Sequence, residues 1–119
     1  MIEIKKKAKC GFDVLAESES FKVAIVTYDE QYGDLKIMKK HRMSDEVFIL
    51  IRGGATLYYF EDGKIETSEL SSENAYNIKR DTWHHLKLTE DAMLVGIENA
   101  DTSKENTDVI NINELRREI

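Results

Sequence analysis

Apolar and polar residues alternate in short runs along most of the chain, and turn-forming residues separate these runs. Short runs rich in β-branched and aromatic side chains are typical of strands, and no long 3.6-residue period indicates a helix before the last few residues. The dipeptide Asp62-Gly63 adds a strong hairpin signal. The pattern predicts an all-β protein whose clearest strands are residues 21–28, 35–40, 46–51, 55–60, 64–70, 76–78, 83–88 and 92–97.

Three further segments lie outside these strands. The cluster Lys5-Lys6-Lys7 is interpreted as the solvated side of an N-terminal strand. Residues 99–111 are polar and carry no period, so a surface arm or extended tail is expected there. A short helix is predicted at residues 114–119, with Asn113 as its N-cap. Strands at hairpin spacing suit a small antiparallel barrel or jelly roll.

Length, charge and cysteine content narrow the function classes. A chain of 119 residues has one core, which predicts one domain over residues 1–119. A net charge of -6 repels nucleic-acid phosphates and anionic lipids, so neither partner is expected. Cys10 is the only cysteine, which excludes an intrachain disulfide, and no apolar run has the length of a membrane span or signal segment. We therefore expect a cytoplasmic protein.

The stretch from Gly33 to Gly53 carries the candidate chemistry, because two potential metal ligands, His41 and Glu46, flank a polar corner between two predicted strands. Its spacing resembles the first motif of the cupin superfamily, which reads Gly, five residues, His-x-His, three or four residues, Glu, six residues, Gly. All of these positions match except the first histidine, where this chain has Lys39.

The second cupin motif is matched only at His84, within residues 73–88. Its glycine, proline, second glycine and asparagine positions are occupied by Glu73, Lys79, Asp81 and Leu88. The resemblance covers roughly residues 35–99 and implies a single cupin domain, an antiparallel double-stranded β-helix or jelly-roll barrel.

The resemblance also implies a metal site made by His41, Glu46 and His84. Two imidazoles and one carboxylate suit one divalent ion, Fe, Zn or Mn, and leave positions open for water or substrate. Lys39 would repel such an ion while it is charged. In the competing interpretation no metal is bound, and Lys39 pairs with Glu46 while the two histidines form neutral hydrogen bonds. A third reading keeps His84 as an ordinary core residue and Glu46 as a surface strand end.

Strand parity indicates which side chains face the barrel interior. Residues two apart share a face, so Lys39 lies on the same face as His41, and His84 faces inward while His85 is expected at the surface. Phe48 and Arg52 share the row of Glu46. Lys39, Phe48 and Arg52 are therefore the candidate substrate-binding residues, although Arg52 also fits a solvated strand end.

Two kinds of function follow, and the sequence leaves both open. One is a metal-dependent enzyme of the isomerase, lyase or oxygenase type that acts on a sugar or a small organic acid. The other is a metal-free cupin that binds a small molecule or serves a structural role. No catalytic residue is assigned. The resemblance, together with the apolar residues Ile2 and Ile4, also implies a homodimer.

Overall fold

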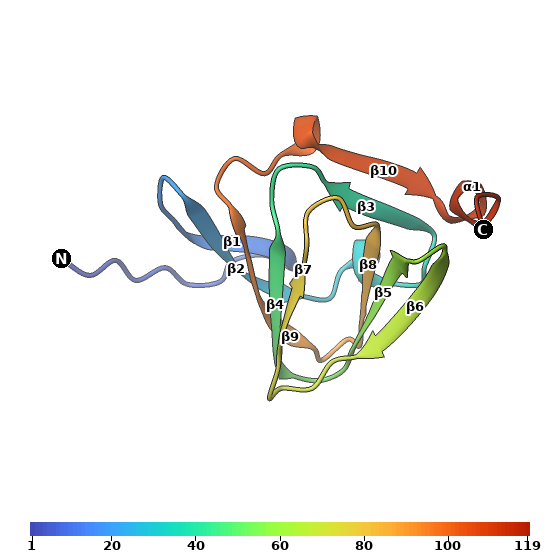
Figure 1. The fold of residues 1–119 in the computed structure, drawn as a ribbon. Helices are drawn as coiled ribbons and strands as arrows, with labels where there is room; N and C mark the ends of the chain where they lie inside the picture. The colour runs from blue at the N-terminus through green and yellow to red at the C-terminus, as the bar shows by residue number, and fades with distance from the viewer.

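The computed structural model describes all 119 residues and contains ten strands in two five-stranded antiparallel sheets (Figure 1). The first sheet has the order β1 (Gly11–Glu17), β2 (Phe21–Thr27), β9 (Met93–Asn99), β4 (Glu46–Arg52) and β7 (Ala75–Ile78). The second has the order β10 (Thr107–Asn111), β3 (Ile37–His41), β8 (His84–Leu88), β5 (Ala55–Glu61) and β6 (Lys64–Glu69). The predicted all-β antiparallel barrel is confirmed.

Helical structure is confined to short segments: two 3-10 turns, η1 (Glu30–Tyr32) and η2 (Lys104–Asn106), and the C-terminal helix α1 (Ile112–Arg116). None of these is long and apolar enough to cross a membrane. The helix begins two residues earlier than expected, because the Asn111 side chain, and not that of Asn113, accepts the capping hydrogen bond. Its buried face packs Ile112 and Leu115 against Met38, on the outer side of β3.

Both ends of the chain differ from the sequence-based expectation. Residues 1–10 form no strand and extend from the barrel as an arm, so the strand expected at Lys5-Lys6-Lys7 is wrong and the first strand begins at Gly11 (Figure 1). The segment 99–111 is not only a surface arm, because its last five residues form β10 and pair along the whole of β3. This pairing joins segments that are distant in the sequence, so no short-range sequence pattern predicts it.

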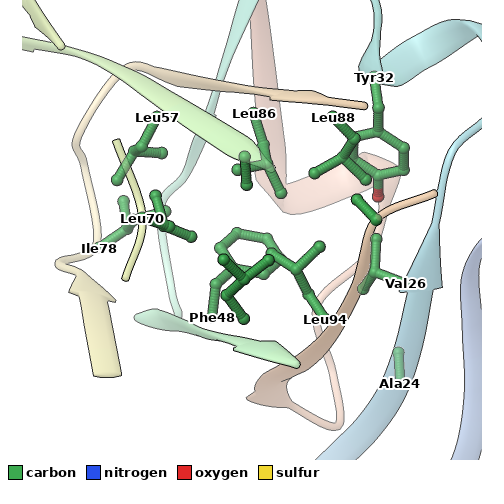
Figure 2. Packing of buried hydrophobic residues seen from close by; sticks show 13 residues of the cluster. Ala24, Val26, Tyr32, Phe48, Leu57, Leu70, Ile78, Leu86, Leu88 and Leu94 are labelled. Carbon is green, nitrogen blue, oxygen red and sulfur yellow. The ribbon is translucent and has the colours of Figure 1, made fainter. Parts of the chain in front are cut away.

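The apolar core fills the space between the two sheets (Figure 2). Alternate residues of each strand point inward, which explains why burial alternates along β4 and β9. The largest contributors include Phe48, Leu86 and Leu94, and each such side chain adds about 1.5–3 kcal/mol when it is fully buried.

The inward faces change from apolar to charged within a few residues. In the first sheet the inward row of Leu50 and Leu94 is apolar, whereas the row of Glu46, Glu98 and Lys22 carries charge. In the second sheet Leu86 gives way to His84 in the same manner. One end of the barrel interior is therefore apolar and stabilises the fold, whereas the other end is polar and could bind a metal or a ligand.

Gly53 ends the first motif in a conformation that few other residues tolerate. Its φ is +76°, and a Cβ atom there would lie 2.5 Å from the Ala92 Cα atom, which is backbone and cannot move aside. Gly63 has nearly the same φ, +78°, but no atom lies within 4 Å of the position of its Cβ. The two glycines separate the cost of the dihedral angle from the cost of the clash.

We expect Gly63→Ala to lower the free energy of unfolding by roughly 1–2 kcal/mol, the cost of a left-handed alanine. Gly53→Ala should cost at least about 2 kcal/mol more, because the 89–92 turn must move. Urea denaturation of both variants measures the difference, and equal losses would contradict the close approach of Gly53 to Ala92.

Candidate metal centre

Three side chains that are distant in sequence meet at the polar end of the barrel: His41 from β3, Glu46 from β4 and His84 from β8. One ligand atom from each lies within 4.8 Å of the other two. The Glu46 Oε1 atom is 3.1 Å from His84 Nε2 and 3.4 Å from His41 Nε2. Glu46 and His84 are both only 6% exposed. Neither is a surface strand end, and the three side chains form a group that could hold a metal ion.

Hydrogen bonds on the far side of each ring determine which imidazole nitrogen faces the centre. His84 Nδ1 lies 2.9 Å from the Thr82 carbonyl oxygen, which only accepts, so Nδ1 carries a hydrogen. His41 Nδ1 lies 2.9 Å from Thr107 Oγ1, and that hydroxyl donates its own hydrogen to the Ser103 carbonyl oxygen at 2.7 Å. His41 Nδ1 is therefore also a donor. In each ring Nε2 is therefore the atom that faces Glu46, where it either donates a hydrogen to the carboxylate or, when unprotonated, offers its lone pair to a metal ion.

Without a metal, the same contacts form a closed ion-pair cluster. Burial alone would raise the pKa of the Glu46 carboxyl, but hydrogen bonds from His41 and His84 outweigh it and lower this pKa. Burial would lower the pKa of His41, yet the Glu46 carboxylate reverses the effect and raises it. The donor set thus binds either protons or a divalent ion. Glu46 is satisfied by the two histidines and not by Lys39, so the expected Lys39–Glu46 pair is absent.

The sequence reasoning missed Glu98, which lies directly opposite Glu46 in the pairing of β4 with β9. Glu98 is 8% exposed, and its Oε1 atom is 3.8 Å from Lys22 Nζ on the next strand. Burial, followed by the nearby Glu46 charge, raises the pKa of Glu98 to about 7. Strand parity could have found it, since the buried Leu94, Gly96 and Glu98 alternate with partly buried positions, but the predicted strand ended at residue 97.

A cavity of about 460 Å³ opens beside the cluster. Of the predicted substrate-binding residues, Lys39 and Phe48 line it, together with the three cluster residues. Lys39 has no carboxylate within ion-pair distance. Tyr32, which the sequence reasoning did not single out, also lines the cavity. Burial raises the pKa of its phenol, so it remains a neutral hydrogen-bond donor.

Two residues lie elsewhere than expected. Arg52 is exposed and outside the cavity lining, because the pairing of β4 with β9 is irregular between Leu50 and Arg52 and breaks the inward alternation. Its Nε atom instead donates to the Asp91 carbonyl oxygen at 3.4 Å. The expectation that His85 is a surface residue is wrong. His85 is buried beneath the turn after η1, where its Nε2 donates to the Gly33 carbonyl oxygen at 2.7 Å, and burial lowers its pKa.

The cluster fits a divalent ion by its donor chemistry. Two imidazole nitrogens and a carboxylate oxygen converge on one point. The Nδ1 atom of each ring hydrogen-bonds to a threonine oxygen, which fixes the orientation of the ring. The first histidine position of the first cupin motif is occupied by Lys39, whose ammonium is not a ligand. Of the four ligand positions in the two cupin motifs, three therefore carry residues that can bind a metal, and one carries a lysine.

Comparison with solved structures identifies the architecture. A Streptomyces Pac13 variant described with uridine shares 13% identity and superposes with a TM-score of 0.65, covering 82% of this chain and 74% of that one. Pac13 is described as a nucleoside dehydratase. KdgF from Halomonas sp. shares 17% identity at a TM-score of 0.60, with coverage of 82% and 88%.

A cupin-2 domain protein from Shewanella frigidimarina shares 24% identity at a TM-score of 0.58, with coverage of 79% and 84%. No protein-family model matches the sequence, and no curated protein matches it either. The chain has the cupin fold. At these identities the likeness concerns the fold, and the function has to be argued from the site.

Proposed function

We propose that this protein binds one divalent ion, Fe, Zn or Mn, through His41, Glu46 and His84, and uses it to act on a small molecule held in the adjacent cavity. The observation that carries the proposal is the convergence of the Nε2 atoms of the partly buried His41 and the buried His84 on the buried Glu46 carboxylate. A bound ion would polarise a carbonyl or hydroxyl oxygen of the substrate, as isomerases, lyases and oxygenases require.

Three of the residues that line the cavity, Lys39, Tyr32 and Phe48, suit an organic acid better than a neutral sugar. Lys39 reaches the cavity without a carboxylate partner, so its ammonium is free to pair with a substrate carboxylate. The neutral Tyr32 phenol can donate a hydrogen bond, and Phe48 provides an apolar wall. That relatives of similar fold are described with uridine or as a nucleoside dehydratase supports a small-molecule ligand and leaves its identity open.

A metal-free binding protein is the second candidate, and the closed His41–Glu46–His84 cluster favours it. Glu46 already has two hydrogen-bonding partners, so the site does not need an ion to satisfy its buried charge. In that case Lys39 and Tyr32 would capture an anionic molecule without chemistry. The homodimer also remains a prediction, and the exposed Ile2 and Ile4 on the N-terminal arm support it (Figure 1).

Metal analysis separates the two candidates. We expect purified protein to retain a divalent metal, and an ion at 100-fold its Kd to raise the melting temperature by roughly 10 °C. Lys39→His should tighten binding by at least about 10-fold, because it removes a positive charge and adds a third imidazole as a fourth ligand.

The opposite outcome has a clear form. If the wild-type protein carries no metal and shows no thermal shift, while Lys39→His takes up metal strongly, the metal-free candidate is correct. Equal, tight metal binding by both proteins would instead show that Lys39 does not oppose the ion.

A further inference from the structure

We infer that Glu98 is a fourth protein ligand of the metal, so that the centre has two histidines and two carboxylates. The inference rests on the proposed metal binding at His41, Glu46 and His84, and it names a ligand outside both motifs. The two imidazoles come from β3 and β8 of one sheet, whereas the two carboxylates come from β4 and β9 of the other. The ion would therefore join the two sheets at the polar end of the barrel.

Register places Glu98 within reach of the cluster. Directly opposed residues of an antiparallel pair have Cβ atoms about 4.5–5.5 Å apart and project from the same face. Glu98 opposes Glu46, and both side chains point into the barrel, as their burial shows. Glu98 also lines the cavity with His41 and His84. Glu98 is not among the residues whose ligand atoms already lie within 4.8 Å of one another, so its side chain would have to turn toward His41, Glu46 and His84 to bind the same ion.

One oxygen of Glu98 has no partner. Oε2 is fully buried and forms no hydrogen bond, while Oε1 lies 3.8 Å from Lys22 Nζ. While Glu98 is ionised, a buried carboxylate oxygen without a donor or a cation is costly, and either a proton shared with Glu46 or a bound cation would relieve that cost. Lys22 is committed elsewhere as well, since it donates to the Thr102 carbonyl oxygen at 2.8 Å. A divalent ion between Glu46 and Glu98 would satisfy Oε2 and offset the repulsion between two adjacent carboxylates.

Glu98 would also supply the ligand that is missing because Lys39 stands where the cupin motif has a histidine. Lys39 is paired in register with His84 on the second sheet, so the motif position without a ligand lies beside a histidine. Glu98 approaches from the first sheet and lines a second cavity together with Lys39 and His41. A set with two carboxylates is harder than one with three histidines, which favours Mn²⁺ and Fe²⁺ over softer ions.

The test measures binding of MnCl₂ by isothermal titration calorimetry and by the electron paramagnetic resonance of the bound ion. We expect Glu98→Gln to weaken Mn²⁺ binding at least about 10-fold and to change the resonance spectrum. The matched control is Glu17→Gln, which removes the same charge from an exposed glutamate paired in register with Lys22, outside the cavity. It should bind Mn²⁺ within about twofold of the wild-type protein.

Lys22→Met distinguishes a ligand from a structural ion pair. If Glu98 binds the metal, this variant keeps or tightens Mn²⁺ binding, because a competing cation is removed. If the only role of Glu98 is its ion pair with Lys22, both Lys22→Met and Glu98→Gln should weaken Mn²⁺ binding to the same extent, and the inference is overturned. This variant also decides the matter if Glu98→Gln fails to fold, which thermal melting would reveal.

The outcomes separate the inference from the proposed function. Wild-type affinity in a folded Glu98→Gln variant overturns the role of Glu98 and leaves the three-ligand centre in place. Absence of Mn²⁺, Fe²⁺ and Zn²⁺ binding by the wild-type protein itself overturns the proposed metal centre.

Discussion

Glu46→Gln is expected to lower the affinity for Mn²⁺ or Zn²⁺ by more than about 100-fold, because Glu46 is the ligand that both histidines face. The amide is nearly isosteric but lacks the negative charge that offsets the ion. In the metal-free protein the change also removes the anion that both imidazoles contact, and we expect a loss of roughly 1–3 kcal/mol in the free energy of unfolding. Calorimetric titration and urea denaturation measure the two effects.

The control for this variant is Glu61→Gln, at an exposed position at the end of β5. It removes the same charge far from the cluster and should alter neither metal affinity nor stability by a measurable amount. Metal binding by Glu46→Gln that matches the wild-type value would show that the cluster is not the metal site.

The stability of the metal-free protein should decrease from pH 5 to pH 8. The pKa of His41 is raised above 6.5 in the folded state, so its contribution is complete below that value and is lost as the pH rises through the folded pKa. The pKa of Glu98 is raised from 4.5 to about 7, so its contribution is complete below 4.5 and is lost as the pH rises toward 7. Both groups act in the same direction, and a fall in melting temperature of roughly 5–10 °C is expected.

Glu46 acts in the opposite direction, and only in acid. Its pKa is lowered in the folded state, so its contribution is present above 4.5 and is lost as the pH falls through the folded pKa. Metal binding should reverse the trend above pH 6, because the Nε2 atoms must be free of protons to bind an ion. Melting curves from pH 2 to 8 with a chelator test the loss of the Glu46 contribution in acid, and curves from pH 5 to 8 with a chelator or with Mn²⁺ test the reversal by metal. Parallel curves with chelator and with Mn²⁺ would contradict the competition between protons and metal.

Much of the fold could be predicted from local sequence patterns. The eight strands predicted from short alternating runs correspond to β2 through β9, because inward and outward side chains alternate along a strand and each strand records its own burial. The strand β10 escaped notice because its polar residues lie at the edge of a sheet and their pairing with β3 involves residues more than 60 positions away. Edge strands need no apolar alternation, so their sequences resemble loops.

Three cluster residues were also predictable, through the spacing of the first motif and the parity of His84. Parity failed where the backbone is irregular or where another segment covers the outer face. The irregular pairing at the end of β4 turned Arg52 away from the cavity, and the turn at Gly33 covered His85. Neither effect can be predicted from the local sequence, since both depend on how distant segments pack.

The amino-acid sequence by itself determined that the chain forms an antiparallel barrel and that His41, Glu46 and His84 share its interior, because side-chain periodicity and motif spacing are local properties. Only the tertiary structure decided that Thr107 and Thr82 orient the two imidazoles, that Glu98 faces Glu46, and that Lys39 reaches the cavity without a carboxylate partner. These features arise where separate strands are brought into register, and that register is set by the packing of the whole barrel.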